Sequence, residues 1–290
     1  MVDLQLLFSS VVFGFSLGSI YFLLSIGLSL CFGLMRIISL DQLLYYSIGA
    51  YFAYSVGVLV DNFWLGVACG MAIGGLAGLA VERLVFLRIY ERDITFSMIT
   101  SFGILIGGIG VIKLFWGVVP RPVPVPIETQ VSILDTEISV YRLVVIAIAG
   151  LVYVGILLFL NRTIIGKAIR AGIEDVEHVE GLGINVYRLF SITFIMAGAL
   201  SALAGALHAP LIMVDPQMGL EVLAFAFMIV IIGGLGSIKG TLVSSLLVGQ
   251  IVSIGSLIYA PLALMAPFAA MIVILLYRPT GLYGSPLLKR

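Results

Sequence analysis

The residues best suited to chemistry form a polar interruption between two long apolar runs near the N-terminus. Its polar side chains are Arg36, Ser39, Asp41, Gln42, Tyr45 and Tyr46. Carboxylate, carboxamide and hydroxyl groups can hydrogen-bond a polar solute, and a broken membrane helix presents such groups at membrane depth. A tight turn on the inner side of a membrane would explain the same residues without a function, and both interpretations remain open. Under the first interpretation, the residues that line a substrate pathway are Ser39, Asp41, Gln42, Tyr45 and Tyr46.

The sequence offers no basis for enzyme chemistry in the chain itself. It contains no His-Glu-x-x-His motif, and the glycine-rich residues 233–240 lack the Lys-Ser/Thr ending of a Walker A sequence. His178 and His208 are far apart in the chain, and neither has metal-ligand spacing around it. Cys31 and Cys69 each lie within an apolar stretch, where cysteine is usually a packing residue. We therefore expect no catalytic residue, no metal and no bound cofactor, and any ATP and Mg²⁺ would belong to partner subunits.

The composition places these polar residues in a membrane protein. The chain has 290 residues, of which 61% are hydrophobic and 10% are charged, and its mean hydropathy is +1.22. Soluble domains carry roughly 25% charged residues. A cytosolic enzyme, a nucleic-acid binder and a disordered linker are therefore excluded as classes. The 15 basic residues balance the 15 acidic residues, so no net charge attracts an ionic partner.

Nine apolar stretches are candidates to cross a bilayer, which requires about 20 apolar residues per helix. They are residues 7–34, 43–60, 63–81, 94–116, 141–160, 187–209, 221–235, 241–258 and 262–277. The stretches 221–235 and 241–258 are the least secure membrane spans, because the first of them is short. The number of spans could therefore be eight. We expect an all-α, polytopic transmembrane helical bundle that forms a single domain over residues 1–290.

The distribution of basic residues predicts the orientation, because cytoplasmic loops are enriched in Lys and Arg. If the loops 82–93 and 161–188 face the cytoplasm, only three of the 15 basic residues lie outside. The C-terminal Lys289 and Arg290 then also lie inside. We therefore expect a periplasmic N-terminus, a cytoplasmic C-terminus and an odd number of spans.

A proline-rich loop, residues 117–140, is expected on the periplasmic side. Pro120, Pro122, Pro124 and Pro126 occupy every second position. Such a run cannot be helical and favours an extended polyproline path. The loop is either a stiff cap over the helices or a docking edge for an external partner.

The loop 161–188 is the longest charged stretch and is expected in the cytoplasm. The residues 167–180 have helical periodicity, so they predict a short amphipathic helix. Gly181 and Gly183 would end this helix, and Asn185 could cap the next one.

This cytoplasmic helix is either a membrane-surface helix or a docking site for a protein. Arg170 and Glu174 stand four residues apart, at a spacing that allows an ion pair. A lipid-binding helix has a face rich in Lys and Arg, but here acidic residues outnumber basic ones. This excess of acidic residues favours a protein partner. The basic residues are Lys167 and Arg170, and the acidic residues are Glu174, Asp175, Glu177 and Glu180.

Several glycines recur at the spacing of close helix contacts. The longest series, Gly66, Gly70, Gly74 and Gly78, forms a stripe along one expected helix, and Gly14/Gly18 and Gly103/Gly107 repeat the spacing. Plain close packing between helices and a moving interface are the two interpretations, and packing is the simpler.

A different set of glycines, Gly233, Gly234 and Gly236, predicts a helix break. Broken backbone at membrane depth is tolerated only where protein or water satisfies it. The break could therefore line a cavity or act as a hinge, and a simple cytoplasmic turn is an equal alternative.

Taken together, the sequence resembles the inner-membrane permease subunits of bacterial ABC importers for branched-chain amino acids, the Liv type. The resemblance runs from residue 18 to 284 and depends on the order and spacing of short motifs. These motifs are Gly18-Ser19-Ile20-Tyr21, Gly33-Leu34-Met35-Arg36-Ile37-Ile38, Gly49-Ala50-Tyr51, residues 162–171, Gly181-Leu182-Gly183-Ile184-Asn185, Gly233-Gly234-Leu235-Gly236-Ser237 and Arg278-Pro279-Thr280-Gly281-Leu282.

The resemblance implies a multi-pass permease of the bacterial inner (cytoplasmic) membrane that works in a complex. The implied partners are a second permease subunit, two cytoplasmic ATPases and a periplasmic substrate-binding protein, with no nucleic acid. The second permease would be a paralogue in a heterodimer. The resemblance assigns coupling with the ATPase to the 161–188 loop. The residues concerned are Gly166, Arg170, Gly172, Glu174, Asp175, Glu177 and Gly183.

One departure from the family pattern leaves the cargo open. Family members commonly carry Asn-Phe-Ala-His-Gly after the first span, where this chain has Ser39-Leu40-Asp41-Gln42-Leu43. Branched-chain amino acids or similar small organic solutes are the expected cargo. The alternatives are a permease of the same family for urea, amides or aromatic or other organic acids, and a secondary transporter that has no ATPase partner.

Overall fold

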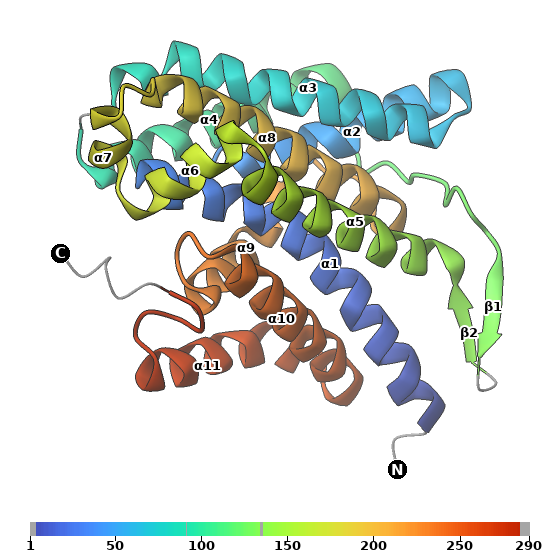
Figure 1. Ribbon diagram of the computed structural model, residues 1–290. Helices are drawn as coiled ribbons and strands as arrows, with labels where there is room; N and C mark the ends of the chain where they lie inside the picture. The colour runs from blue at the N-terminus through green and yellow to red at the C-terminus, as the bar shows by residue number, and fades with distance from the viewer. Residues whose placement is uncertain (1–3, 91, 134–135, 285–290) are drawn as a thin grey trace.

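The computed structural model describes residues 4–90, 92–133 and 136–284, and most of them are helical (Figure 1). Lys289 and Arg290, expected on the cytoplasmic side, lie outside the described residues. The long elements are α1 (Leu4–Met35), α2 (Gln42–Val60), α3 (Phe63–Leu84), α4 (Ile94–Trp116), α5 (Val140–Arg162), α8 (Val186–His208), α9 (Met218–Gly233), α10 (Ile238–Ile258) and α11 (Leu262–Tyr277). The short elements are η1 (Phe86–Arg88), β1 (Gln130–Ile133), β2 (Thr136–Ser139), α6 (Ile164–Glu174), α7 (Val176–Gly181) and η2 (Ala209–Leu211).

Each of the nine predicted apolar stretches coincides with a helix. Seven of the described helices are long and apolar enough to cross a membrane, and α9 and α11 are shorter apolar helices of 16 residues each. A 16-residue helix is about 24 Å long, somewhat less than the roughly 30 Å hydrocarbon core. The fold is therefore the expected all-α polytopic bundle. The number of helices that cross the membrane and the orientation stay predictions.

The centre of the bundle is α1, which packs against α8, α9 and α10 (Figure 1). In this view α2, α3, α4 and α8 lie on one side of α1, and α9, α10 and α11 lie on the other. Both α1 and α8 are 72% buried over their most apolar window, whereas α4 and α5 are only 22% buried. The two outer helices therefore present most of their apolar surface to the surroundings, as helices that face lipid do.

The glycine stripe of α3 serves two neighbours. Gly66 and Gly70 lie against the backbone of α2, whereas Gly74 and Gly78 lie against α8. A Cβ atom added to Gly70 would stand 2.9 Å from the carbonyl oxygen of Gly49, so a larger residue would force the helices apart. Close packing is thus confirmed as a role of the stripe.

The two shorter glycine pairs behave differently from each other. Gly14 and Gly18 pack against α10, where an added Cβ at Gly18 would lie 2.8 Å from the carbonyl oxygen of Ser245. Gly103 and Gly107 on α4 have no neighbour within 4 Å of such an atom among the described residues. The prediction of a close helix contact at Gly103 and Gly107 is therefore wrong within the subunit.

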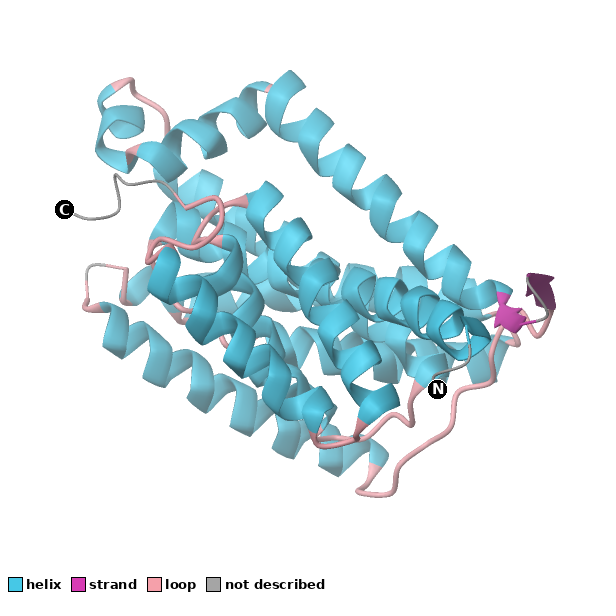
Figure 2. Ribbon diagram, turned by 90° about the horizontal axis from the view of Figure 1, so that it is seen from below, coloured by secondary structure: helices cyan, strands magenta, loops and turns pink. Residues whose placement is uncertain are grey.

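The proline-rich loop is extended, as predicted, and leads into a hairpin that the sequence analysis did not predict. Arg121 exchanges two backbone hydrogen bonds of 2.9 Å with Val214, and its guanidinium group donates to the Tyr54 hydroxyl at 3.1 Å. Antiparallel strands β1 and β2 follow, and β2 runs directly into α5. Figure 2 shows α5 at the edge of the bundle, between this hairpin and the α6–α7 corner at its other end.

Candidate substrate path and coupling surface

The polar interruption separates α1 from α2 by six residues. The α1 helix ends at Met35, and Arg36 has a left-handed φ of 54°, which turns the chain out of the helix. Asp41 occupies the position before α2 and accepts backbone hydrogen bonds from Leu44 and Tyr45 at 2.9 and 3.2 Å. The sequence therefore breaks the helix, and the polar side chains after the exposed Arg36 stay inside the protein.

The side chain of Asp41 is the centre of a buried hydrogen-bond network. The hydroxyl of Ser39 donates to Oδ1 of Asp41, and the hydroxyl of Tyr45 donates to Oδ2, both at 2.5 Å. The carboxylate is 0% exposed, so it depends on these donors in place of water.

Gln42 connects this carboxylate to the helices on either side. Its Nε2 atom donates to Ser39 Oγ at 3.3 Å and lies 3.8 Å from Cys31 Sγ of α1. Its Oε1 atom accepts a hydrogen bond of 3.0 Å from Ser201 of α8. We call Cys31, Ser39, Asp41, Gln42, Tyr45 and Ser201 the break network.

The structure brings four of the five predicted pathway residues together and separates the fifth. Ser39, Asp41, Gln42 and Tyr45 share the break network, whereas the Tyr46 hydroxyl bonds Nδ1 of His208, the last residue of α8. All five side chains are buried and satisfied within the subunit. Their role in a substrate pathway stays a prediction. The sequence analysis missed their partners on α8, Ser201 and His208.

An apolar cavity of about 290 Å³ lies beside the break network, and we call it the break cavity. Ser39 is its one polar lining residue among those described, and aliphatic and aromatic side chains form the rest. The lining residues are Leu28, Phe32, Ile37, Ile38, Ser39, Ile94, Phe227, Val230, Ile231 and Leu235. A small branched aliphatic group matches this lining chemically.

The predicted cytoplasmic helix is divided into α6 and α7 at Asp175. This residue is extended, and its Oδ1 atom accepts hydrogen bonds from the amides of Glu177 and His178 at 3.0 and 3.2 Å. These bonds, together with a 2.7 Å contact from the His178 ring, hold the pKa of the half-buried Asp175 carboxyl below its usual range. The expectation of one continuous helix is wrong, because Asp175 is an N-cap residue.

The ends of the α6–α7 pair follow the sequence signals. Gly183 has a φ of 78° just after α7, as an end signal requires. Asn185 caps α8 by accepting a 3.1 Å hydrogen bond from the Arg188 amide.

The predicted coupling residues divide between the two faces of α6. Gly166 and Gly172 are buried within the subunit, and their role in ATPase coupling stays a prediction. A Cβ at Gly166 would collide with the Phe159 carbonyl oxygen of α5, and one at Gly172 would lie 2.5 Å from Leu34 Cδ1 of α1. Both glycines thus position α6 against the bundle.

The remaining coupling residues lie toward the surface, at the end of the bundle opposite the hairpin (Figure 1). Arg170 donates a 2.8 Å hydrogen bond to Asn161 and makes no ion pair with Glu174. Asp175 is half-buried and acts as the cap, while Glu177 and Gly183 are exposed. The structure therefore leaves an acidic surface at this corner.

The glycine break at 233–236 is a turn that touches both α1 and α6. Gly234 and Gly236 have φ values of 96° and 79°. A Cβ at Gly236 would lie 2.9 Å from Gly33 Cα and 3.5 Å from Ile173 of α6. Gly233 ends α9, and its carbonyl accepts a 3.0 Å hydrogen bond from the amide of Tyr283. Because Leu235 also lines the break cavity, the turn contributes to a cavity wall as well.

The sequence analysis missed a buried carboxyl group, Glu82 of α3. Its side chain is 0% exposed and accepts 3.0 Å hydrogen bonds from the hydroxyls of Tyr90 and Ser191. Arg83 Nε lies 3.4 Å from the same carboxyl group. The available signal was a single acid, next to Arg83, at the end of a long apolar run in α3.

A serine motif in α1 has no catalytic surroundings. Gly14-Phe15-Ser16-Leu17-Gly18 has the Gly-x-Ser-x-Gly pattern of hydrolases, which places the serine on a strand-to-helix turn. Here Ser16 lies within a helix, is 0% exposed and has no hydrogen-bond partner in the described part of the chain. The pattern is therefore a helix-packing sequence.

Known proteins resemble this chain along most of its length. It is 27% identical to the high-affinity branched-chain amino acid transport system permease protein LivH of Salmonella typhimurium, over 94% of each chain. It is 26% identical to the permease protein BraD of Pseudomonas aeruginosa, from a system of the same description, over 95% of each chain.

The fold also resembles a solved structure. One chain of PsaBC from Streptococcus pneumoniae, in complex with Fab, superposes with a TM-score of 0.51. The match covers 93% of this chain and 91% of that one at 12% identity, so it supports the fold alone. The family model described as branched-chain amino acid transport system / permease component matches residues 10–276. The chain therefore belongs to the family of permease components of branched-chain amino acid transport systems.

Proposed function

We propose that this chain is one permease subunit of an ATP-driven importer in the bacterial inner membrane. A second permease subunit, a paralogue in a heterodimer, completes the pathway. Two cytoplasmic ATPases supply the energy, and a periplasmic binding protein delivers the cargo. The cargo is a branched-chain amino acid or a similar small organic solute, as in the names of the LivH and BraD relatives.

The exposed surface of the α6–α7 corner supports docking of an ATPase there. Leu182, between α7 and α8, is 78% exposed although it lies outside every membrane-spanning candidate. Exposed leucine beside acidic residues is typical of protein interfaces, whose apolar centre is surrounded by polar groups. The exposed acidic residues Glu174, Glu177 and Glu180 precede Leu182 in the chain.

The contact between α6 and the end of α1 carries the proposal. Gly172 packs on Leu34, and Ile173 packs on the Gly33–Gly236 contact. Leu34 belongs to the last turn of α1, directly before the break. A displacement of α6 by a closing ATPase would therefore reach the break network through packed atoms, which transmit movement because protein interiors are close-packed.

The break cavity supports an aliphatic cargo. Its walls are apolar apart from Ser39 among the described residues, and burial of an aliphatic side chain there removes apolar surface from water. Urea and small amides have no apolar group to fill such a cavity. Among the cargoes of related permeases, branched-chain amino acids thus match it best.

Copurification tests the partnership directly. The tagged chain, solubilised from its native membrane, is expected to retain an ATPase, and Leu182→Ser is expected to reduce the amount retained. Val131→Ser on β1 is the matched control, because Val131 is also exposed but lies at the opposite end of the bundle. A wild-type chain that transports solute without any ATPase would instead identify a secondary transporter.

A further inference from the structure

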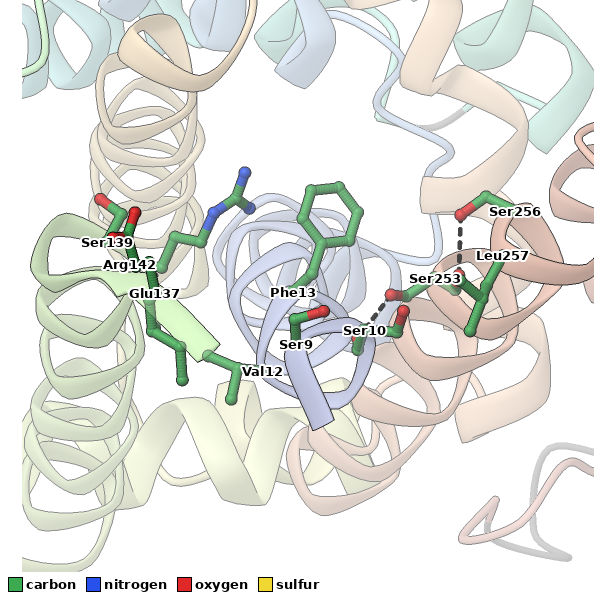
Figure 3. Close-up of a pocket in the computed structure, with 11 residues that line it drawn as sticks. Ser9, Ser10, Val12, Phe13, Glu137, Ser139, Arg142, Ser253, Ser256 and Leu257 are labelled. Carbon is green, nitrogen blue, oxygen red and sulfur yellow. Dashed lines mark hydrogen bonds between the residues drawn. The ribbon is translucent and has the colours of Figure 1, made fainter. Parts of the chain in front are cut away.

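A second cavity, of about 460 Å³, lies at the hairpin end of the bundle, and we call it the hairpin cavity (Figure 3). Three segments far apart in the sequence form its walls: the first turns of α1, strand β2 with the start of α5, and the last turns of α10. Five serines and several apolar side chains line it, together with one arginine and one glutamate. Its volume is within the range of about 300–1,000 Å³ that is usual for small-molecule sites.

Arg142 is the cation of this cavity and has no anionic partner in the described part of the chain. Its side chain is half-buried and its guanidinium carbon lies 4.4 Å from the centre of the Phe13 ring. No hydrogen bond or ion pair to a described residue satisfies its N–H groups. A partly desolvated guanidinium group is costly without an anion, and its planar donors match a carboxylate in two parallel bonds.

Glu137 supplies the opposite charge from β2. Its side chain is exposed and lines the same cavity, yet it makes no ion pair with Arg142 or with any other described residue. The two charges therefore remain unpaired in the wall that β2 and the start of α5 form. A purely anionic ligand would be repelled by Glu137, and a purely cationic one by Arg142. A ligand that carries both charges satisfies both groups.

The remaining walls specify the rest of the ligand. Val12, Phe13 and Ile138 provide apolar surface, and the serine hydroxyls can donate or accept hydrogen bonds. We propose that the hairpin cavity binds a zwitterionic α-amino acid with an apolar side chain. Arg142 binds the α-carboxylate and Glu137 binds the α-ammonium group. This inference depends on the proposed function and adds a place where the permease itself holds the cargo.

The position of the cavity agrees with this role. It lies at the end of the bundle that the distribution of basic residues predicts to face outward, where the cargo arrives. The α1–α10 contact at Gly14 and Gly18 closes the bundle beyond it. The cavity is therefore an entry subsite, distinct from the break cavity at the opposite end of α1.

Binding of labelled leucine to the purified permease complex, without nucleotide, tests the inference. Two competitors retain the apolar group: leucinamide lacks the carboxylate, and 4-methylpentanoate lacks the ammonium group. We expect each to bind roughly tenfold or more weakly than leucine. Arg142→Gln is expected to weaken leucine binding by a similar factor and to abolish the discrimination against leucinamide. Glu137→Gln is expected to abolish the discrimination against 4-methylpentanoate.

Lys113→Gln is the matched control, because Lys113 is a cation near the end of α4 that lines none of the described cavities. It is expected to leave binding and discrimination unchanged. Size-exclusion chromatography of each variant complex shows whether it is folded, and Arg142→Lys, which keeps the charge, is expected to retain part of the affinity.

Two results would overturn the inference. One is an Arg142→Gln complex that binds leucine and discriminates against leucinamide as the wild type does. The other is a wild-type complex that imports leucine but binds none at this site. Failure of the proposed function is a separate result, namely absence of ATP-dependent leucine uptake by the wild-type complex.

Discussion

The hydroxyl of Ser201 on α8 donates a 3.0 Å hydrogen bond to Oε1 of Gln42, the first residue of α2. Both side chains are 0% exposed, and they lie 159 positions apart in the sequence. This bond fixes the break between α1 and α2 against the most buried part of the bundle. The break between α1 and α2 thus has a defined structure with its own hydrogen-bond partners. A displacement of α6 can either preserve or disturb these hydrogen bonds.

Asp41→Asn is expected to destabilise the break network and to reduce uptake. The Ser39 and Tyr45 hydroxyls both donate to Asp41, and an amide retains only one acceptor oxygen. One buried hydroxyl hydrogen loses its acceptor, at a cost of about 1–3 kcal/mol. Thermal unfolding in detergent and uptake in cells measure the two effects.

Asp61→Asn is the control for this change. Asp61 is exposed, and its φ of 52° is in the left-handed region that asparagine tolerates well. Unaltered stability and uptake in both variants would contradict a role for the break network.

Tyr90→Phe is expected to weaken the anchor between the α3–α4 connection and α8. The phenol of Tyr90 donates a 3.0 Å hydrogen bond to the buried Glu82 carboxyl group. Loss of this bond is expected to cost about 1–3 kcal/mol in the free energy of unfolding. Tyr187→Phe is the control, because the neighbouring Tyr187 contacts Tyr90 through its ring alone. Equal unfolding midpoints for the two variants would show that Glu82 does not depend on Tyr90.

Gly166→Ala is expected to displace α6 from α5. The added methyl group would meet the Phe159 carbonyl oxygen and the Leu160 Cα atom, and backbone atoms cannot turn aside as a flexible side chain can. Such overpacking costs about 1–3 kcal/mol. ATPase copurification should fall with Gly166→Ala. It should remain at the wild-type amount with Gly181→Ala, where the methyl group meets no described atom within 4 Å.

The α7 helix is expected to lose stability in acid. The amide and ring of His178 lower the pKa of Asp175, so its stabilising effect is complete above the unfolded-state pKa of about 3.9. The effect declines as the pH falls through the lower folded-state pKa, because protonation removes the acceptor charge. Hydrogen exchange of the α7 amides measures this loss.

The Asp175→Asn variant separates the effect of the carboxylate charge from the effect of the N-cap hydrogen bonds. Asparagine is also a good N-cap residue, so it should preserve the helix while the acid-dependent step disappears. An acid-dependent step of wild-type size in this variant would assign the titration to another group.

The sequence was sufficient to predict the long helices because a local signal marks each one. That signal is a continuous apolar run, which needs about 20 residues to cross a bilayer. The end signals at Gly183 and Asn185 were also local and correct. The division at Asp175 was missed because the residue fits the helical pattern and is at the same time an N-cap. The β1–β2 hairpin was missed because four-residue strands are too short to show a clear alternation.

The candidate site was only half predictable for a different reason. Ser39, Asp41 and Gln42 were found because polar residues stand out against an apolar run. Their partner Ser201 was not, because a serine among small residues of α8 carries no signal of a contact far away in the sequence. Gly166 and Gly172 were assigned to ATPase coupling, and the sequence carried no signal of the close approach of α5 and α1 to them.

Uptake of labelled leucine by proteoliposomes that contain the purified permease complex tests the central claim most directly. ATP is supplied on the side of the α6–α7 corner, and the binding protein is supplied on the side of the hairpin. We predict accumulation of leucine that requires hydrolysable ATP and is absent with a non-hydrolysable analogue. Accumulation at the same rate from an ion gradient alone, without ATP, would contradict the account.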